Sequence, residues 1–209
     1  MTGRWCAVEP LDADAHAEDL FAANSADDAM WSYMGYGPFE TLDAFRGWIA
    51  DFASGPDPLF FAIRNEAGAP VGMASYLRIA PAAGAIEIGN LCFSPALQST
   101  RAATEALTLL MGRAFALGYR RVEWKCNALN ARSRRLAQRL GFSFEGVHRQ
   151  AIVVKGRNRD TAWYSVIDGE WPALSAVFAE WLDPANFDAG GRQRARLSDM
   201  TRPLLSCEG

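Results

Sequence analysis

The middle of the chain carries a regular succession of strand-like and helix-like patterns. Residues 85–93 form a largely apolar run, which is typical of a buried strand. After a turn, apolar residues recur at steps of three and four, which predicts an amphipathic helix. They are Ala103, Ala106, Leu107, Leu110, Ala114 and Leu117. Residues 121–127 then alternate between apolar and polar, as in a half-buried strand, and residues 130–142 predict a short helix closed by glycine.

The regions on either side predict the other elements of a mixed α/β sheet. Before the centre, strands are expected over residues 4–10, 59–64 and 71–79. Two helices separate the first two strands, one capped by Asp12 or Asp14 and one capped by Thr41. After the centre, two strands are expected over residues 146–154 and 161–167, around a polar tip at 155–160, with a last helix over 173–182.

This order of elements predicts one domain with an appended tail. The domain is expected over residues 1–182, a length that can bury a sizeable core. The tail, residues 183–209, is rich in glycine and arginine and weakly patterned. We expect it to be partly ordered, or docked on a partner subunit in a possible homodimer.

The junction between the central strand and its following helix is a candidate anion site. The first backbone N–H groups of a helix lack partners inside the helix and carry the positive end of its dipole. A turn over residues 98–103 would offer such groups to phosphate oxygens.

The ordered set of motifs resembles one known family. A strand, a phosphate turn, a helix, a second strand, Asn130-x-x-Ser133 and a helix ending in Leu-Gly-Phe142 form the central pattern of the GCN5-related N-acetyltransferases (GNAT). The likeness is greatest to the branch similar to ribosomal-protein N-terminal acetyltransferases, and it covers roughly residues 4–171. It implies a single domain of about seven strands, with flanking helices and a central parallel pair splayed into a V. Arg101 stands where the family usually has glycine.

The resemblance also implies a co-substrate, acetyl-CoA, and the residues that bind it. Backbone amides of the turn would hold the pyrophosphate, the end of the central strand would pair with the pantetheine arm, and Arg101 would add a cation if its backbone is helical. The expected coenzyme contacts are Leu91, Cys92, Phe93, Gln98, Ser99, Thr100, Arg101, Ala102, Ala103, Asn130 and Ser133. For Asn130 and Ser133, a turn and a helix cap are the competing interpretation.

Two residues are candidates for proton transfer. Glu87 lies on the central strand, where relatives often place a glutamate that accepts the proton of the amine through water. A structural ion pair is an equally weighted explanation of Glu87. Ser133 is a possible donor to the leaving sulfur, because Ala137 occupies the position where many relatives carry a tyrosine acid. An unassisted thiolate is the alternative, since a thiol has an ordinary pKa of about 8.5.

The acceptor is expected to be a primary amine, either of a protein N-terminus or of a small molecule. Residues 29–39 are too aromatic for a plain solvated linker, and Trp31, Tyr33 and Tyr36 are candidates for the wall of its pocket. Core packing beneath a loop is an even alternative for this segment.

The composition restricts the classes of binding partner and the cellular compartment that are expected for this protein. Lys and Arg number 21 against 24 Asp and Glu, and a net charge of −3 argues against nucleic acid as a partner, although Arg132, Arg134, Arg135 and Arg139 form a local basic patch. No apolar run approaches the roughly 20 residues that span a membrane, and no signal segment is evident, so a cytoplasmic protein is expected. The four cysteines are scattered and the two histidines have no partner motif, so no metal site is expected.

The sequence therefore predicts a cytoplasmic acetyl-CoA-dependent N-acetyltransferase that works by direct transfer in a ternary complex. A non-catalytic acyl-CoA-binding or regulatory module is the alternative. A nucleic-acid binder that uses the arginine-rich helix and the tail is a further rival.

Overall fold

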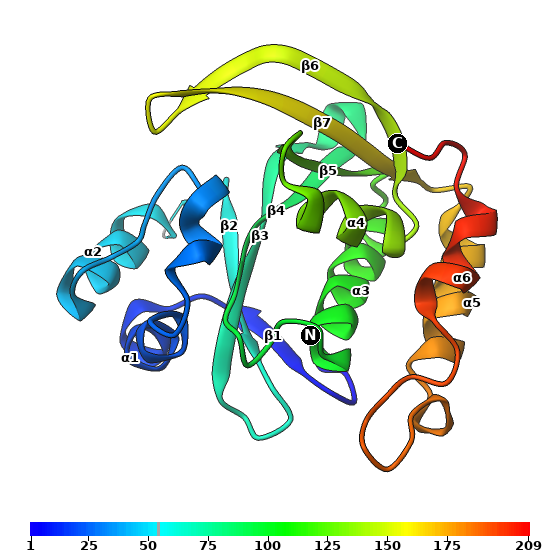
Figure 1. Ribbon diagram of the computed structural model, residues 1–209, viewed down its shortest axis with the longest axis horizontal. Helices are drawn as coiled ribbons and strands as arrows, with labels where there is room; N and C mark the ends of the chain where they lie inside the picture. Colours follow the sequence, from blue (N-terminus) through cyan, green and yellow to red (C-terminus); the bar gives the residue numbers. More distant parts are fainter. Residues whose placement is uncertain (54) are drawn as a thin grey trace. The chain divides into compact units, whose positions relative to one another are not determined.

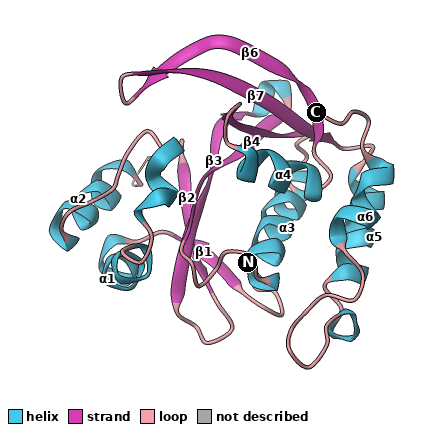
Figure 2. Ribbon diagram, viewed as in Figure 1, coloured by secondary structure: helices cyan, strands magenta, loops and turns pink. Residues whose placement is uncertain are grey.

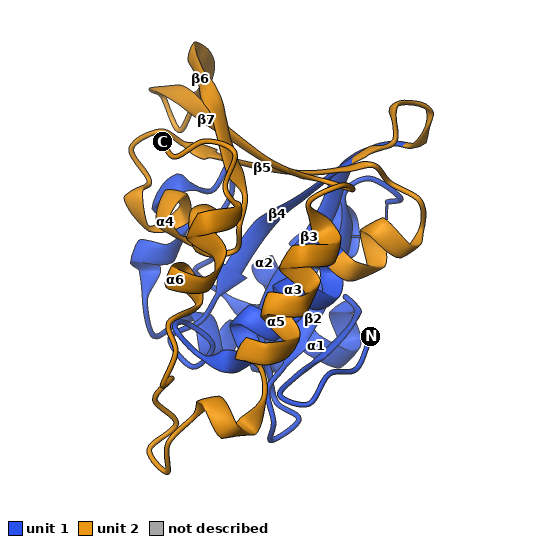
Figure 3. Ribbon diagram, turned by 90° about the vertical axis from the view of Figure 1, so that its right-hand side faces the viewer, with its two compact units in different colours: residues 1–80, 86–111 blue, residues 81–85, 112–209 orange. Residues whose placement is uncertain are grey.

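The structure is a computed structural model that describes residues 1–53 and 55–209. In this part of the chain seven strands form a sheet in the order β1-β2-β3-β4-β5-β7-β6, and helices occur between and after them (Figure 2). The chain divides into two compact units, shown in two colours in Figure 3. The first comprises residues 1–80 and 86–111, and the second comprises residues 81–85 and 112–209.

The first unit holds the N-terminal strands and helices. Its elements are β1 (Ala7–Pro10), α1 (Ala13–Asn24), the 3₁₀ helix η1 (Asp28–Tyr33), α2 (Leu42–Phe52), β2 (Leu59–Arg64), β3 (Pro70–Ala80), most of β4 (Ala85–Phe93) and the first part of α3 (Arg101–Ala116). β2 pairs antiparallel with both β1 and β3. The predicted caps are present, because Asp12 accepts a hydrogen bond from the Ala15 amide (2.8 Å) and Thr41 accepts one from the Ala44 amide (3.2 Å).

The first strand is shorter than the sequence predicts. It begins at Ala7 rather than Arg4, because the amides of residues 4–6 donate to the carboxylate of Glu105 in α3 and are not available to a neighbouring strand. The N–H to oxygen distances are 2.7, 2.6 and 2.9 Å. The N-terminal segment is thereby fixed to the second turn of α3.

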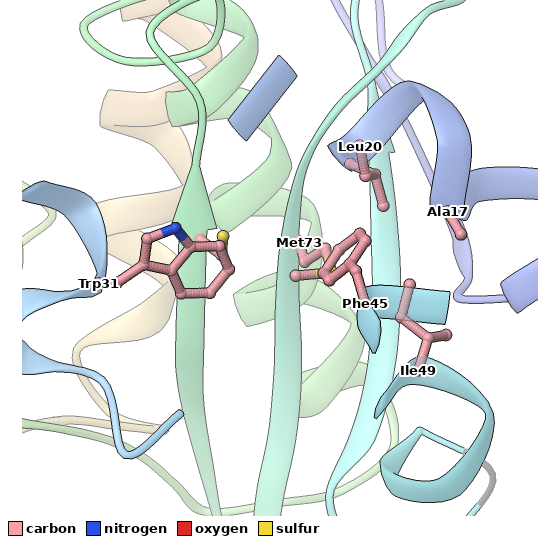
Figure 4. Close-up of a cluster of buried hydrophobic side chains, with 7 residues drawn as sticks. Ala17, Leu20, Trp31, Phe45, Ile49 and Met73 are labelled. Carbon is pink, nitrogen blue, oxygen red and sulfur yellow. The ribbon is translucent and has the colours of Figure 1, made fainter. Parts of the chain in front are cut away.

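The core of the first unit lies where α1 and α2 cover one face of the strands (Figure 1). Phe45 and Ile49, four residues apart on α2, pack with Leu20 of α1 and Met73 of β3 (Figure 4). Trp31 of η1 belongs to the same cluster and is 3% exposed.

The second unit is built on an antiparallel sheet with helices beside it. Its elements are β5 (Arg121–Asn127), α4 (Ala131–Arg139), β6 (Ser143–Val154), β7 (Arg157–Ile167), α5 (Trp171–Trp181), η3 (Pro184–Asn186), α6 (Leu197–Thr201) and η4 (Arg202–Leu204), together with the end of α3 and the short η2 (Pro81–Ala83). β7 pairs antiparallel with β5 and with β6. The long hairpin of β6 and β7 is prominent in Figure 1.

Two expectations about this unit are wrong in detail. The predicted six-residue tip of the hairpin is a two-residue turn, since Val154 pairs with Arg157 and the residues between, Lys155 and Gly156, both have positive φ (49° and 72°). Leu117 is not on the buried stripe of α3, because the helix ends at Ala116 and Gly118 (φ 90°) turns the chain away. The side chain of Leu117 is 54% exposed.

The residues after 183 return to the rest of the second unit. Helix α6 packs beside α5 and α4, and the Thr201 hydroxyl donates to the Arg139 carbonyl (3.1 Å). At the start of β6, the Phe144 amide donates to the Cys207 carbonyl (3.0 Å). In the described residues no helix has the length and apolarity needed to cross a membrane.

Candidate active site

Strand β4 has an irregular backbone in the middle of its course. Asn90 adopts the left-handed conformation (φ 51°), which is uncommon outside glycine but least unfavourable for Asn and Asp. Its side chain is fixed on both sides, because the amide donates to Ser75 Oγ (2.9 Å) and Oδ1 accepts from the Tyr36 hydroxyl (3.4 Å). Such outliers within strands gather at functional sites. The sequence reasoning missed Asn90, although an asparagine after glycine inside an apolar strand was a possible signal.

The predicted phosphate turn follows β4 directly and is held in place by its own side chains. Gln98 Nε2 donates to the Phe93 carbonyl (2.8 Å), and the Thr100 hydroxyl both donates to the Leu97 carbonyl (2.7 Å) and accepts from the Ala103 amide (3.1 Å). Ser99 is left-handed (φ 62°). These bonds shape a rigid turn at the start of α3.

Two backbone amides of this turn are available to a ligand. Within the described residues, no hydrogen bond runs from the Ser99 or Ala102 N–H to another group. Both lie at the N-terminal end of a 16-residue helix, where the dipole favours an anion. This arrangement fits a phosphate or diphosphate group.

Arg101 is the first residue of α3 and has no left-handed backbone, so glycine is not required at this position. Its guanidinium is engaged on two sides. Nε and one terminal nitrogen donate to the carboxylate of Glu66 at 2.9 and 3.1 Å, and the group lies 3.5 Å from the centroid of the Trp5 ring. The positive charge is thus fixed beside the turn by a bidentate ion pair.

Glu87 is buried, with 3% of its surface exposed, and forms an ion pair with Arg78 of β3. Its neighbours Ile86 and Ile88 are buried as well. The ion pair that the sequence left open as an explanation is therefore present.

Asn130 and Ser133 lie in the second unit, at the start of α4. Asn130 caps this helix by accepting from the Ser133 amide (3.1 Å), so the cap interpretation holds for its oxygen. Ser133 Oγ accepts from the Trp124 indole N–H (3.0 Å). Arg134 donates to the buried Tyr164 hydroxyl (2.9 Å), and Ala137 is fully buried.

The aromatic segment divides between core and surface. Trp31 is buried, Tyr33 is 38% exposed, and Tyr36 is partly buried with its ring 4.4 Å from that of Trp48 and 6.0 Å from that of Trp31. Burial raises the pKa of Tyr36 well above its ordinary value of 10.0, so its hydroxyl stays protonated at neutral pH.

The buried thiols are poor nucleophiles. Burial raises the pKa values of Cys6, Cys92 and Cys126 above their ordinary value, and Glu105 raises that of Cys6 further. The nearby Ser133 hydroxyl opposes the shift at Cys126 without reversing it. In the described part of the chain, no group of three or more His, Cys, Asp or Glu side chains is arranged so that it could hold a metal ion.

A family model described as "Acetyltransferase (GNAT) domain" matches residues 7–143, about two thirds of the chain. The chain belongs to the GNAT acetyltransferase family. A GCN5-related N-acetyltransferase from Brucella melitensis is 45% identical, with 96% of this chain and 93% of that chain covered and a TM-score of 0.94. The family predicted from the sequence motifs is confirmed.

Other solved structures agree with this GNAT assignment. A probable acetyltransferase from Chromobacterium violaceum is 47% identical, covering 82% of this chain and 87% of that one, with a TM-score of 0.79. Microcin C7 self immunity acetyltransferase, solved in complex with acetyl-CoA and AMP, shares the fold at 21% identity and a TM-score of 0.70, with 79% and 93% covered. No curated protein matches the chain. The predicted mixed α/β fold with flanking helices is confirmed, whereas the V-shaped splay of its central strands stays a prediction.

Proposed function

We propose that this GNAT acetyltransferase moves the acetyl group of acetyl-CoA directly to a primary amine in a ternary complex. The observation that carries the proposal is the turn before α3, where the Ser99 and Ala102 amides have no partner in the described residues and the helix dipole favours an anion. The acetyl-CoA in the complex of the microcin immunity enzyme supports the choice of coenzyme.

Different residues of the chain would bind different parts of the coenzyme. The amides of residues 98–103 would take the diphosphate, and the backbone of residues 91–93, just past the irregular Asn90, would pair with the pantetheine arm. Asn130 would contact the coenzyme through the amide nitrogen that its capping bond leaves unused. Arg101 would add a cation at the diphosphate by exchanging the Glu66 carboxylate for phosphate oxygens.

The chemistry needs a neutral amine and a protonated leaving group. Acetyl-CoA supplies the acetyl group as an activated thioester. Glu87, paired with Arg78, would accept the proton of the amine through water, and the Ser133 hydroxyl would donate to the sulfur. Trp31, Tyr33 and Tyr36 would line the acceptor pocket. Because the buried cysteines stay protonated, direct transfer is favoured over an acyl-enzyme.

The decisive experiment measures amine-dependent release of coenzyme A with a thiol reagent, across peptides with free N-termini and small primary amines. Release with at least one amine is expected. Tight binding of acetyl-CoA without release by any amine would instead support the acyl-CoA-binding module, for which the buried Ala137 is the structural argument.

Substitutions of the two members of the Glu87–Arg78 ion pair test whether Glu87 is the general base or has only a structural role. Glu87→Gln is expected to lower kcat more than it weakens coenzyme binding. Arg78→Gln keeps the carboxylate but removes its partner, so it should retain more turnover than Glu87→Gln does. Equal losses of kcat in the two variants would exclude Glu87 as the base.

A further inference from the structure

A small pocket of the first unit lies at the end of α1, beside η1 and the start of α2. It is lined by Phe21, Asn24, Ser25, Asp28, Trp31, Phe39 and Phe45. Its volume of about 20 Å³ admits one group of the size of a water molecule. The pocket therefore selects for a very small polar group.

Asn24 is the unusual member of this pocket. Its side chain is 3% exposed, and neither Oδ1 nor Nδ2 has an oxygen or nitrogen partner in the described part of the chain. The polar group beside it is the Cys92 thiol, a weak hydrogen-bonding group. Burying a side-chain amide without hydrogen-bond partners costs free energy. A hydrogen-bond donor that binds in the pocket would therefore be stabilised by donating to the side-chain Oδ1 of Asn24.

The charges around the pocket favour a cation. Asp28, an exposed acidic residue, is among the residues that line it, and no basic residue is. The segment from the second half of α1 to the start of η1, residues 18–28, contains four carboxylates and no lysine or arginine. These residues are Glu18, Asp19, Asp27 and Asp28. Such a segment raises the local concentration of cationic ligands.

The aromatic walls point to the same ligand. The Phe39 ring lies 5.5 Å from that of Trp31 and 5.2 Å from that of Phe45, and the three rings belong to the lining. Aromatic faces attract an ammonium group. An –NH₃⁺ group has three donors and the size of water, so it suits the Asn24 carbonyl, the Asp28 carboxylate and the rings together.

We propose that this pocket binds a primary ammonium group of the acceptor, and that this ammonium is not the amine that receives the acetyl group. The carboxylate of Asp28 favours the charged form of a bound amine, whereas attack on a thioester requires the neutral form. The acceptor therefore carries a second amine. This inference rests on the proposed amine acetylation and narrows its substrate to linear diamines and longer polyamines.

The test compares linear diamines of increasing length with monoamines of matching length, using acetyl-CoA and the coenzyme A release assay. At least one diamine should have a KM about tenfold or more below that of its monoamine. Replacing its far ammonium by trimethylammonium should remove the advantage, because that group does not fit the pocket. Equal KM values for diamines and monoamines would overturn the proposal.

Two variants and a matched control assign the effect to the pocket. Asp28→Asn and Asn24→Leu should bring the diamine KM to the monoamine value while the KM of acetyl-CoA stays unchanged. Asp19→Asn removes the same charge from an exposed position of α1 outside the pocket, and it should keep most of the preference. An equal loss in Asp19→Asn and Asp28→Asn would contradict a specific site.

A binding measurement separates this inference from the proposed function. If no amine releases coenzyme A, the proposed function fails, yet the pocket can still be examined by thermal shift. Diamines should raise the Tm of the wild type more than monoamines do, and should do so less for Asp28→Asn. The absence of a difference in the wild type would refute the ammonium site. Asp28 is exposed, so this variant gives a result even if Asn24→Leu does not fold.

Discussion

The carboxylate of Glu105 allows a quantitative test of how the N-terminal segment is held. Glu105 is 6% exposed and accepts three backbone N–H bonds, one on Oε1 from Arg4 and two on Oε2 from Trp5 and Cys6. Glu105→Gln keeps the shape but provides a single acceptor atom. If the amide oxygen takes the place of Oε2, the amide nitrogen meets the Arg4 N–H, and two donors face each other.

The expected loss follows from these three bonds. A hydrogen bond to a charged group contributes about 1.5–3 kcal/mol, and a neutral acceptor about 0.5–1.5 kcal/mol. Losing one bond costs about 1.5–3 kcal/mol and weakening the other two costs roughly 1 kcal/mol each, so Glu105→Gln should destabilise the protein by about 3.5–5 kcal/mol. The wider effect is release of Trp5 from the Arg101 guanidinium.

Urea unfolding followed by circular dichroism measures this loss directly. Glu18→Gln is the matched control, since Glu18 is an exposed residue of α1, and it should change the unfolding free energy by less than about 0.5 kcal/mol. A loss below about 1 kcal/mol for Glu105→Gln would refute the reasoning. It would mean that the three amides are satisfied equally well without the charge.

Three further predictions concern the turn, a glycine pair and an ion pair. Ser99→Gly should preserve acetyl-CoA affinity and stability because φ is already positive, whereas Ser99→Val should cost about 1–2 kcal/mol and weaken coenzyme binding in calorimetry. Gly118→Ala and Gly141→Ala both force alanine into positive φ, but only at Gly141 would the new methyl meet a neighbour, Leu174, at 2.3 Å. The first should lower stability by roughly 1 kcal/mol and the second by more than about 2 kcal/mol, and equal thermal shifts would contradict the packing argument. Arg121 and Ser165 hold the pKa of Glu145 below its ordinary value of 4.5, so this carboxylate stabilises the fold above that pH and the effect is lost as pH falls through the folded pKa. Glu145→Gln should cost up to about 1 kcal/mol at pH 7, given the partial exposure of the pair, and the difference between the unfolding curves should shrink as the pH is lowered below 4.5.

Local patterns carried most of the fold prediction. Caps such as Thr41 and the alternation in β5 depend on neighbours within a few residues, so the sequence records them directly. Leu117 was misplaced because a helical period continues past the point where Gly118 ends the helix. The extra residues of β1 were assigned to a strand because their partner, Glu105, lies about 100 positions away.

The site was predictable in its backbone and less so in its side chains. The phosphate turn was located because its strand–turn–helix context is local. The pairing of Arg101 with Glu66 and the link from Asn90 to Tyr36 join residues 35 and 54 positions apart. The contact of Glu87 with Arg78 joins two successive strands, β4 and β3, so it depends on side-chain directions that a strand pattern alone does not give. The domain boundary at 182, the individual roles of the site residues and a homodimer stay predictions.

The uneven distribution of charge has a practical consequence for handling the protein. A net charge of −3 suggests an ordinary acidic protein that passes through a cation exchanger. Residues 146–163 of the β6–β7 hairpin nevertheless carry Arg149, Lys155, Arg157 and Arg159 against a single carboxylate, Asp160, while residues 12–28 are purely acidic. The basic segment can bind a cation exchanger and the acidic segment can bind an anion exchanger. Chromatographic retention should therefore depend on which of the two segments contacts the matrix rather than on the isoelectric point.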